Sequence, residues 1–338
     1  MKNDLKVFTL TNSKGNKIKV TNYGAKIMSV IVPDKTGNKN NIVLGYDSAE
    51  KYVNGDPYFG AVIGRYANRI AEGKFKLDGK TYNLPRNDNQ NHLHGGPGGF
   101  NNVIWEAKKI KHNNSEALEL FYFSKDGEEG YPGNLEVTMI YTWTDDNELQ
   151  IDYKATTDKN TIINLTHHSF FNLKDGGRSK ITEHELTINA DNFLPVDNSL
   201  IPTGEIRSVK DTPMDFRKPK KIGADINADY DQLKKGKGYD HNWVLNKPEQ
   251  GKMTLAAKVK EPESGRIMEV YTTEPGLQFY SGNFLEGEEE RNDIKYKNRT
   301  AFCLEAQHFP DSPNQAKFPS TVLKAGEEYK QTTIYKLL

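Results

Sequence analysis

The sequence predicts an all-β fold, a large antiparallel β-sandwich, on three observations. Apolar and polar residues alternate with a period of two along most of the chain, as in strands with one buried face. Turn residues, mainly Gly, Asn and Asp, separate these segments at intervals of about 8 to 12 residues. No segment keeps a 3.6-residue apolar period over three turns. We therefore expect stacked antiparallel sheets.

The first half of the chain predicts hairpins and a meander. A turn at 13–16 separates two alternating segments, and an apolar run at 25–32 ends at Pro33. The dipeptide Asp78-Gly79 is the strongest short hairpin signal. The meander is predicted from strands at 118–123, 137–143 and 149–155.

The second half continues with strands, and helix signals are sparse. One helical turn is predicted at 48–52 and one short helix at 222–233. Strands are predicted at 185–190, 241–245, 253–259, 267–271, 277–280, 299–305 and 329–338. We find no internal repeat and no linker of biased composition, so we expect residues 1–338 to form one domain.

Composition excludes several classes of function. The chain has 46 Lys plus Arg and 46 Asp plus Glu, so no net field attracts a nucleic acid or an anionic membrane. The single cysteine, Cys303, excludes an internal disulfide and is interpreted as a small core residue. A polar N-terminal segment, and the absence of any apolar stretch of about 18 residues, predict a cytoplasmic protein.

Glu305 is the anomaly in the last apolar strand. It is the only carboxylate among residues 301–306, a run that Pro310 and neighbouring turn residues close. A carboxylate is rarely withdrawn from water without a partner. Either a cation neutralises Glu305 structurally, or the group is held ready for proton chemistry.

Several polar clusters could meet Glu305. Arg65 and Arg69 follow a short strand and could hold sugar hydroxyls or a carboxylate, or form surface salt bridges. In an extended segment His92 and His94 point the same way, which would suit a metal-binding pair. The adjacent His167 and His168 face opposite sides of a strand, so at most one of them should line a pocket.

A further cluster mixes polar and aromatic residues as sugar sites do. Asp240 and His241 stand beside Trp243, and Gln278 lies near Tyr280. The alternative is an Asp-containing turn that enters a strand.

Six blocks in order resemble the aldose 1-epimerase family, also called galactose mutarotase. The resemblance runs from about residue 22 to the C-terminus. The blocks are Ala-Asn-Arg-Ile at 67–70, Leu-His-Gly-Gly at 93–96, Thr-His-His-Ser-Phe-Phe-Asn-Leu at 166–173, Tyr-Asp-His at 239–241, Pro-Gly-Leu-Gln-Phe-Tyr at 275–280 and Leu-Glu-Ala-Gln-His-Phe-Pro at 304–310.

The resemblance implies a galactose mutarotase-like supersandwich that interconverts the anomers of free galactose or glucose, as a monomer or homodimer, without cofactor or metal. It implies Glu305 as general base and His168 as general acid. The further implied contacts are His94 near the ring oxygen, Arg69 and Asp240 on hydroxyls, and Asn68 and Gln278 on the substrate. The family usually has Asn before the acid histidine, and we interpret His167 as a neighbour on the opposite strand face.

Mutarotation requires one proton to leave the anomeric hydroxyl while another reaches the ring oxygen, which a paired base and acid provide. Ordinary pKa values of about 4.3 for Glu and about 6.5 for His suit these roles, and we expect the nearby carboxylate to raise the histidine pKa modestly.

Four alternatives stay open. A silent sugar-binding protein could use Arg69, Asp240 and the aromatic residues without proton transfer. A hexose-phosphate epimerase should need more cations than the clustered Arg65 and Arg69. A cupin-like metal site would use the histidines, and a glycoside hydrolase would need a second carboxylate, for which Asp240 is the candidate.

Overall fold

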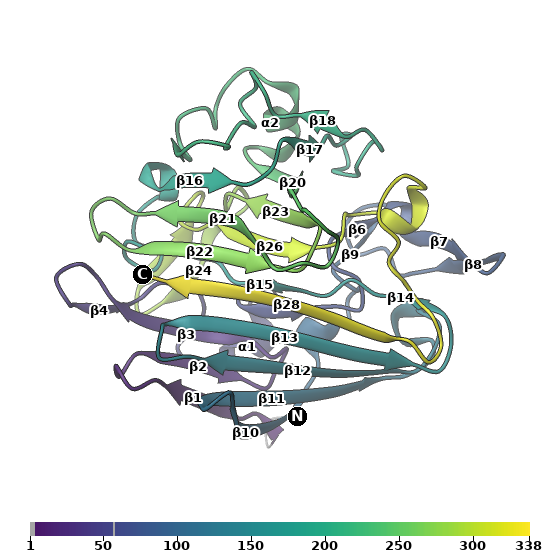
Figure 1. The fold of residues 1–338 in the computed structure, drawn as a ribbon, viewed down its shortest axis with the longest axis horizontal. Helices are drawn as coiled ribbons and strands as arrows, with labels where there is room; N and C mark the ends of the chain where they lie inside the picture. The colour runs from purple at the N-terminus through teal and green to yellow at the C-terminus, as the bar shows by residue number, and fades with distance from the viewer. Residues whose placement is uncertain (1–3, 57) are drawn as a thin grey trace.

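The largest element is a nine-stranded antiparallel sheet that crosses the front of the molecule in Figure 1. The computed structural model describes residues 4–56 and 58–338. The C-terminal strand lies at the centre of this sheet, between β13 and β22, and so joins the two halves of the sheet. In spatial order the strands are β10 (Glu106–His112), β11 (Ser115–Ser124), β12 (Leu135–Trp143), β13 (Glu148–Thr157), β28 (Glu328–Leu337), β22 (Ile267–Thr272), β21 (Thr254–Lys260), β16 (Glu185–Ile188) and β19 (Lys220–Lys221).

A five-stranded sheet lies behind the upper part of the large sheet (Figure 1). Apolar residues of both sheets, such as Phe279 and Leu304 from one and Val270 and Tyr335 from the other, belong to one buried cluster. This packing confirms the predicted all-β fold of stacked antiparallel sheets. The strands in order are β18 (Arg207–Ser208), β17 (Asn192–Leu194), β20 (Asp240–Val244), β23 (Gly276–Tyr280) and β26 (Cys303–Gln307).

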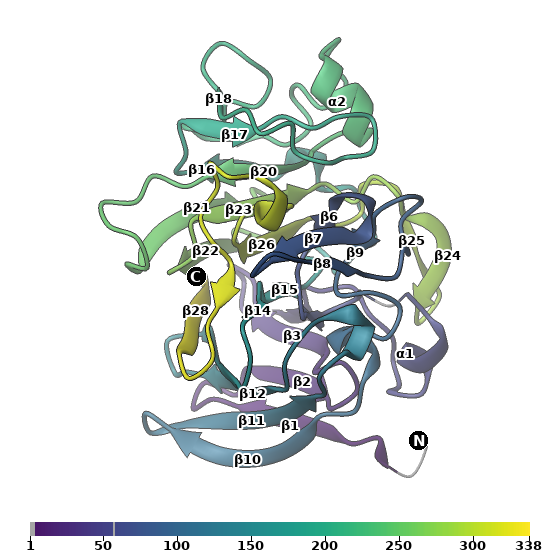
Figure 2. The ribbon, with the colours of Figure 1, turned by 90° about the vertical axis from the view of Figure 1, so that its right-hand side faces the viewer.

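The remaining strands form a four-stranded sheet and five pairs. In Figure 2, β6 to β9 lie on the side that faces the viewer, in front of β15 and β26. The four-stranded sheet contains β1 (Val7–Thr11), β2 (Lys17–Thr21), β3 (Ile27–Pro33) and β4 (Lys39–Asn41). The pairs are β5 (Ala61–Ile63) with β15 (Thr166–His168), β6 (Arg69–Ile70) with β9 (His92–Leu93), β7 (Lys74–Leu77) with β8 (Lys80–Asn83), β14 (Thr161–Ile162) with β27 (Val322–Leu323), and β24 (Glu286–Arg291) with β25 (Ile294–Lys297).

The predicted hairpins and the meander are confirmed. β1 pairs with β2 across the 13–16 turn, and β11, β12 and β13 are consecutive neighbours. The turn between β7 and β8 places Asp78 at φ 50° and Gly79 at φ 76°, the left-handed pair that a two-residue hairpin needs. β10 was not predicted, because its sequence Glu-Ala-Lys-Lys-Ile-Lys-His is highly charged. Such charges suit an edge strand, since they discourage pairing with another molecule.

Two boundaries differ from prediction. The helix expected at 222–233 is wrong for most of its length, since residues 222–229 form turns and bends and the helix α2 starts at Asp231. Gly223 and the Asp and Asn residues of this stretch favour turns by bonding to nearby backbone. The strand predicted at 299–305, β26, starts at Cys303 instead of 299, because Arg299 adopts a left-handed φ of 63°.

The helices are short. They are α1 (Lys51–Asn54), α2 (Asp231–Gly236) and the single 3₁₀ turns Ala71–Gly73, Phe100–Asn102, Glu128–Gly130, Ile181–Glu183 and Ser312–Asn314. Among the described residues, no helix has the length and apolar character needed to cross a membrane.

A buried arginine joins the large sheet to the loops beside it. The Arg266 guanidinium, with the residue 3% exposed, donates hydrogen bonds to five backbone carbonyls. These acceptors belong to Val32, Pro33, Asn38, Leu173 and Lys174. The planar fork of donors suits this cage of carbonyls, which an ammonium group with three donors cannot satisfy in full.

We therefore expect Arg266→Lys to lower the free energy of unfolding by about 2 to 4 kcal/mol, because buried carbonyls lose their donors. Urea unfolding followed by circular dichroism measures the change, with the exposed Arg178→Lys as matched control. An unchanged midpoint for Arg266→Lys would show that these five bonds contribute little.

Candidate active site

The pleat of the five-stranded sheet separates an apolar face from a polar one. Leu304 and Ala306 enter the core between the sheets, whereas Glu305 lies on the opposite face. In the ladder Gln278 stands directly opposite Glu305, and Asp240 is two residues from the partner of Gln278 on the next strand. Glu305 is therefore one member of a polar row that three strands present together.

A cavity of about 740 Å³, counted with the solvent at its open mouth, lies on this polar face. All seven residues that the sequence analysis assigned to a site line it. They are Asn68, Arg69, His94, His168, Asp240, Gln278 and Glu305. The other lining residues are Asp56, Tyr58, Leu93, Phe170, Tyr280, Phe284 and Leu285. The seven assigned residues come from six segments far apart in the sequence, and these segments converge on a single cavity.

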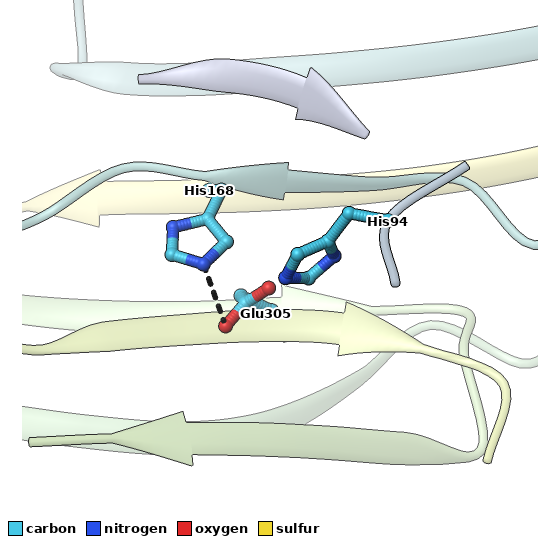
Figure 3. Close-up of side chains that lie close together, drawn as sticks. All are labelled: His94, His168 and Glu305. Carbon is cyan, nitrogen blue, oxygen red and sulfur yellow. Dashed lines mark ion pairs between the residues drawn. The ribbon is translucent and has the colours of Figure 1, made fainter. Parts of the chain in front are cut away.

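Glu305 and His168 meet at the base of the site. Nε2 of His168 lies 3.6 Å from Oε1 of Glu305, while Oε2 of Glu305 is buried with no hydrogen-bond partner among the described residues. Figure 3 shows the rings of His168 and His94 directed toward Glu305 from the same side. On its far side, Nδ1 of His168 lies 3.6 Å from the Cys303 sulfur. Cys303 is buried as predicted, and its contact with His168 was not foreseen.

Burial shifts these two groups in opposite directions. Loss of hydration, reinforced by the Asp240 charge, raises the pKa of Glu305 well above its ordinary value. Loss of hydration lowers the pKa of His168 to about 4. The expected upward shift of the histidine pKa is therefore wrong. Burial of the imidazole lowers the His168 pKa more than the neighbouring Glu305 can raise it. Burial also disfavours the ionised form of Glu305, which weakens the effect of Glu305 on the histidine.

The backbone at His94 determines which ring nitrogen carries hydrogen. Its Nδ1 accepts a hydrogen bond from the Asn68 N–H at 3.2 Å, so a neutral ring carries its hydrogen on Nε2. Burial and the neighbouring His168 and Arg69 lower the His94 pKa, which keeps the ring neutral. His94 therefore offers a hydrogen-bond donor through Nε2.

His94, His168 and Glu305 also have the donor count of a metal site, with one ligand atom each, all within 4.8 Å of one another. A ligating His94 Nε2 would have to give up its hydrogen, and Nδ1 would then carry one toward the Asn68 N–H. This conflict argues against a cation at the three groups.

The expected pairing of His92 with His94 is wrong. His94 has a left-handed φ of 53°, which breaks the extended geometry that would direct both rings to one side. His92 instead donates from Nδ1 to the Pro85 carbonyl and accepts from the Tyr131 hydroxyl at Nε2, each at 2.7 Å. It is a structural residue outside the cavity.

An ion-pair network forms the opposite wall. Arg69 Nε donates to Asp88 at 2.7 Å, and Nη1 lies 3.9 Å from Asp240. Gln278 donates from Nε2 to Asp240 at 2.7 Å, which leaves its buried Oε1 without a partner among the described residues. Burial raises the Asp240 pKa, and Arg69 and Gln278 oppose that rise. The wall therefore carries polar groups suited to sugar hydroxyls.

The fully buried amide of Asn164 holds three site segments together. Its Nδ2 donates to the carbonyls of Ala67, just before Asn68 and Arg69, and of His308, just after β26. Its Oδ1 accepts from the His308 N–H, and the nearby Thr166 hydroxyl donates to the Ala306 carbonyl. These bonds fix the strand of His168 relative to the strand of Glu305.

Several predicted candidates lie elsewhere. Arg65 is buried and donates to the carbonyls of Ser124, Pro132 and Gly133, so it is structural. His167 faces the large sheet, where its ring packs edge-on to Tyr141. This placement confirms that only His168 of the pair lines the cavity. Trp243 lies in the core and donates to the Met214 carbonyl.

The aromatic walls come from residues that sequence reasoning did not assign. The Tyr58 ring packs on His94 and on His168, with ring centroids 4.8 and 5.7 Å away. Phe170 lies behind His168, and Phe284, which is 44% exposed, stacks on Tyr280 at the mouth. No motif marked Tyr58 or Phe284, although both are aromatic residues in loops close to assigned blocks.

Comparison with known proteins agrees with this geometry. A sequence profile of the aldose 1-epimerase family matches residues 6–336. The galactose mutarotase of Bos taurus is 45% identical over 321 residues, 95% of this chain and 90% of that one. The aldose 1-epimerase of Escherichia coli (strain K12) is 41% identical over 335 residues, 98% and 95% of the two chains.

Among solved structures, galactose 1-epimerase from Lactobacillus acidophilus NCFM matches with a TM-score of 0.87 and 31% identity, covering 99% of this chain and 94% of that one. An aldose epimerase homologue from C. elegans has the same TM-score at 29% identity, covering 99% of each chain. The resemblance inferred from the six sequence blocks is thereby confirmed: the chain belongs to the aldose 1-epimerase family of isomerases and has the galactose mutarotase-like fold.

Proposed function

We propose that this protein interconverts the α and β anomers of a free, unphosphorylated aldose such as galactose or glucose. The observation that carries the proposal is the 3.6 Å approach of His168 to Glu305 in one cavity. Its relatives are named galactose mutarotase and aldose 1-epimerase. We propose that one domain carries the activity. A cytoplasmic location and a monomeric or homodimeric state stay predictions.

In the proposed reaction Glu305 removes the proton of the anomeric hydroxyl while His168 protonates the ring oxygen, so the C1 to ring-oxygen bond breaks. The open aldehyde turns about the C1 to C2 bond, and the two groups exchange roles as the ring closes on the other carbonyl face. The Nε2 hydrogen of His94 would support the ring-oxygen region, and Arg69, Asp240, Gln278 and Asn68 would bind hydroxyls.

The opposite pKa shifts suit these roles. A raised pKa makes ionised Glu305 a stronger base, and a lowered pKa makes protonated His168 a stronger acid. The pair needs one proton in total. The form with ionised Glu305 and protonated His168 differs from the neutral pair only by transfer of that proton between them. The sugar hydroxyls that enter the cavity help to stabilise the ionic form, because they solvate charges that burial disfavours.

Charge argues for an unphosphorylated substrate. Asp56, Asp240 and Glu305 line the cavity, whereas Arg69 is the one lining Arg or Lys among the described residues and already faces two aspartates. A phosphate group would meet net negative charge there. This arrangement disfavours the hexose-phosphate alternative. A non-catalytic sugar-binding protein would not need the close contact between Glu305 and His168. The rate of mutarotation distinguishes such a protein from the proposed enzyme.

We expect Glu305→Gln and His168→Gln each to lower the rate of mutarotation by about 100- to 10,000-fold, because each removes one positioned proton carrier. Polarimetry on freshly dissolved α-galactose measures the rate, and thermal unfolding checks that the variants are folded. Near-normal rates in either folded variant would contradict the assigned roles.

The rate should depend on pH as a bell. Below a pKa near 4 both groups are protonated, so the base is lost and the rate falls as pH drops. As pH rises through the raised pKa of the pair, both groups lose their protons, and the acid is lost. The pH profile of kcat/KM, corrected for spontaneous mutarotation, reports both limits. A rate that keeps rising through the alkaline range would exclude the proposed acid.

Asp240→Asn should act mainly on binding. The carboxylate accepts from Gln278 and faces Arg69, so its loss leaves polar groups of the wall poorly paired with sugar hydroxyls. We expect KM to rise about tenfold or more, with a smaller change in kcat. Initial rates over a galactose concentration series give both constants, and an unchanged KM would remove Asp240 from the binding wall.

A further inference from the structure

The cavity contains a buried carboxylate that no cation balances. Glu305 is 2% exposed, and its Oε2 has no hydrogen-bond partner among the described residues. Its nearest basic neighbours, His94 and His168, are imidazoles whose burial disfavours a positive charge. Cys303 and the tyrosines 58 and 280 stay neutral, since burial raises the pKa of each.

The cations around the cavity already have partners or lie in water. Arg69 faces both Asp88 and Asp240. Asp56 interacts electrostatically with the buried Lys26. Lys237 is exposed at the rim, where its Nζ lies 5.4 Å from the Phe284 ring and water screens it. Counted together, Arg69 meets two carboxylates, and no other Arg or Lys among the described residues that line the cavity stabilises the ionised form of Glu305.

We propose that the cavity is also a binding site for polyhydroxylated six-membered rings that carry a protonated amine, with the ammonium group against Glu305. The hydroxyls would use the wall of Arg69, Asp240 and Gln278, as a hexose would. The ammonium would donate to the unpartnered Oε2, and His168 in its neutral form could accept through Nε2. An ammonium group at this position would compensate the loss of hydration that disfavours ionised Glu305, so binding of the amine and ionisation of Glu305 would support each other.

The position of the charge follows from the proposed function, on which this inference rests. Glu305 faces the anomeric centre in the proposed reaction, so the amine should stand where C1 stands in the sugar. A nitrogen in place of the ring oxygen would instead face the Nε2 hydrogen of His94, which is a donor. The structure therefore favours iminosugars whose ring nitrogen replaces C1.

A matched pair of ligands tests the proposal on the intact protein. Isothermal titration calorimetry at pH 7 compares galacto-configured isofagomine, with nitrogen in place of C1, with neutral 1,5-anhydro-2-deoxy-D-lyxo-hexitol, since both ligands lack the 2-hydroxyl. Neither has an anomeric hydroxyl, so neither can react. We expect the amine to bind at least about tenfold more tightly, since one buried charge pair forms at short range. Equal dissociation constants in the wild-type protein would overturn the proposal without any variant.

Two further measurements define the contact and its relation to catalysis. Glu305→Gln should reduce the preference for the amine to less than about threefold, while the exposed carboxylate variant Glu263→Gln should keep it. A preference retained in folded Glu305→Gln would overturn the role of Glu305. Amine binding in a protein without mutarotation would reject the proposed function alone, and mutarotation that the amine does not inhibit would reject this inference alone.

Discussion

The structure of the site depends on withdrawing one carboxylate from water on the polar face of a sheet whose other face is core. The pleat makes this possible: Leu304 and Ala306 anchor β26 against the large sheet, and Glu305 must then point the other way. The large apolar contact supplies the energy that keeps the strand in place. The unfavourable burial of Glu305 is therefore a local cost that the surrounding core can sustain.

Holding His168 opposite Glu305, the proposed acid and base, is a separate problem, because the two residues come from distant parts of the chain. The side-chain amide of Asn164, two residues before β15, forms hydrogen bonds with the backbone of Ala67 and of His308, which follows β26. Because the strands hold the bonded backbone atoms in place, these hydrogen bonds help to keep His168 3.6 Å from Glu305. An imidazole on a free loop would not be held at this distance.

Much of the fold and the seven site residues could be predicted, and the failures have identifiable causes. The period-two pattern located most strands, and the six ordered blocks located the residues around the cavity. The period-two pattern did not reveal β10, because the charged residues of this edge strand hide the alternation. It also could not show that His94 leaves the extended conformation. Trp243 was considered as an aromatic partner of Asp240 in a sugar site. Side chains three residues apart on a strand point to opposite faces, and Trp243 lies in the core. The direction of the His168 pKa shift could not be predicted, because it depends on how deeply the ring is buried, and no sequence motif gives that.

The charge distribution connects catalysis with the choice of ligand. Among the described residues that line the cavity, Arg69 is the one Arg or Lys, and it already faces Asp88 and Asp240. We therefore expect a phosphate to find no free cation there, whereas the proposed neutral sugar needs no ionic partner. A fixed positive neighbour would lower the pKa of Glu305, and in the proposed reaction this change would weaken Glu305 as a proton acceptor. In the proposed function, selectivity against anionic sugars and the strength of the base would therefore have one physical origin. A cation placed beside Glu305 to improve the binding of anions would weaken proton removal in the same step.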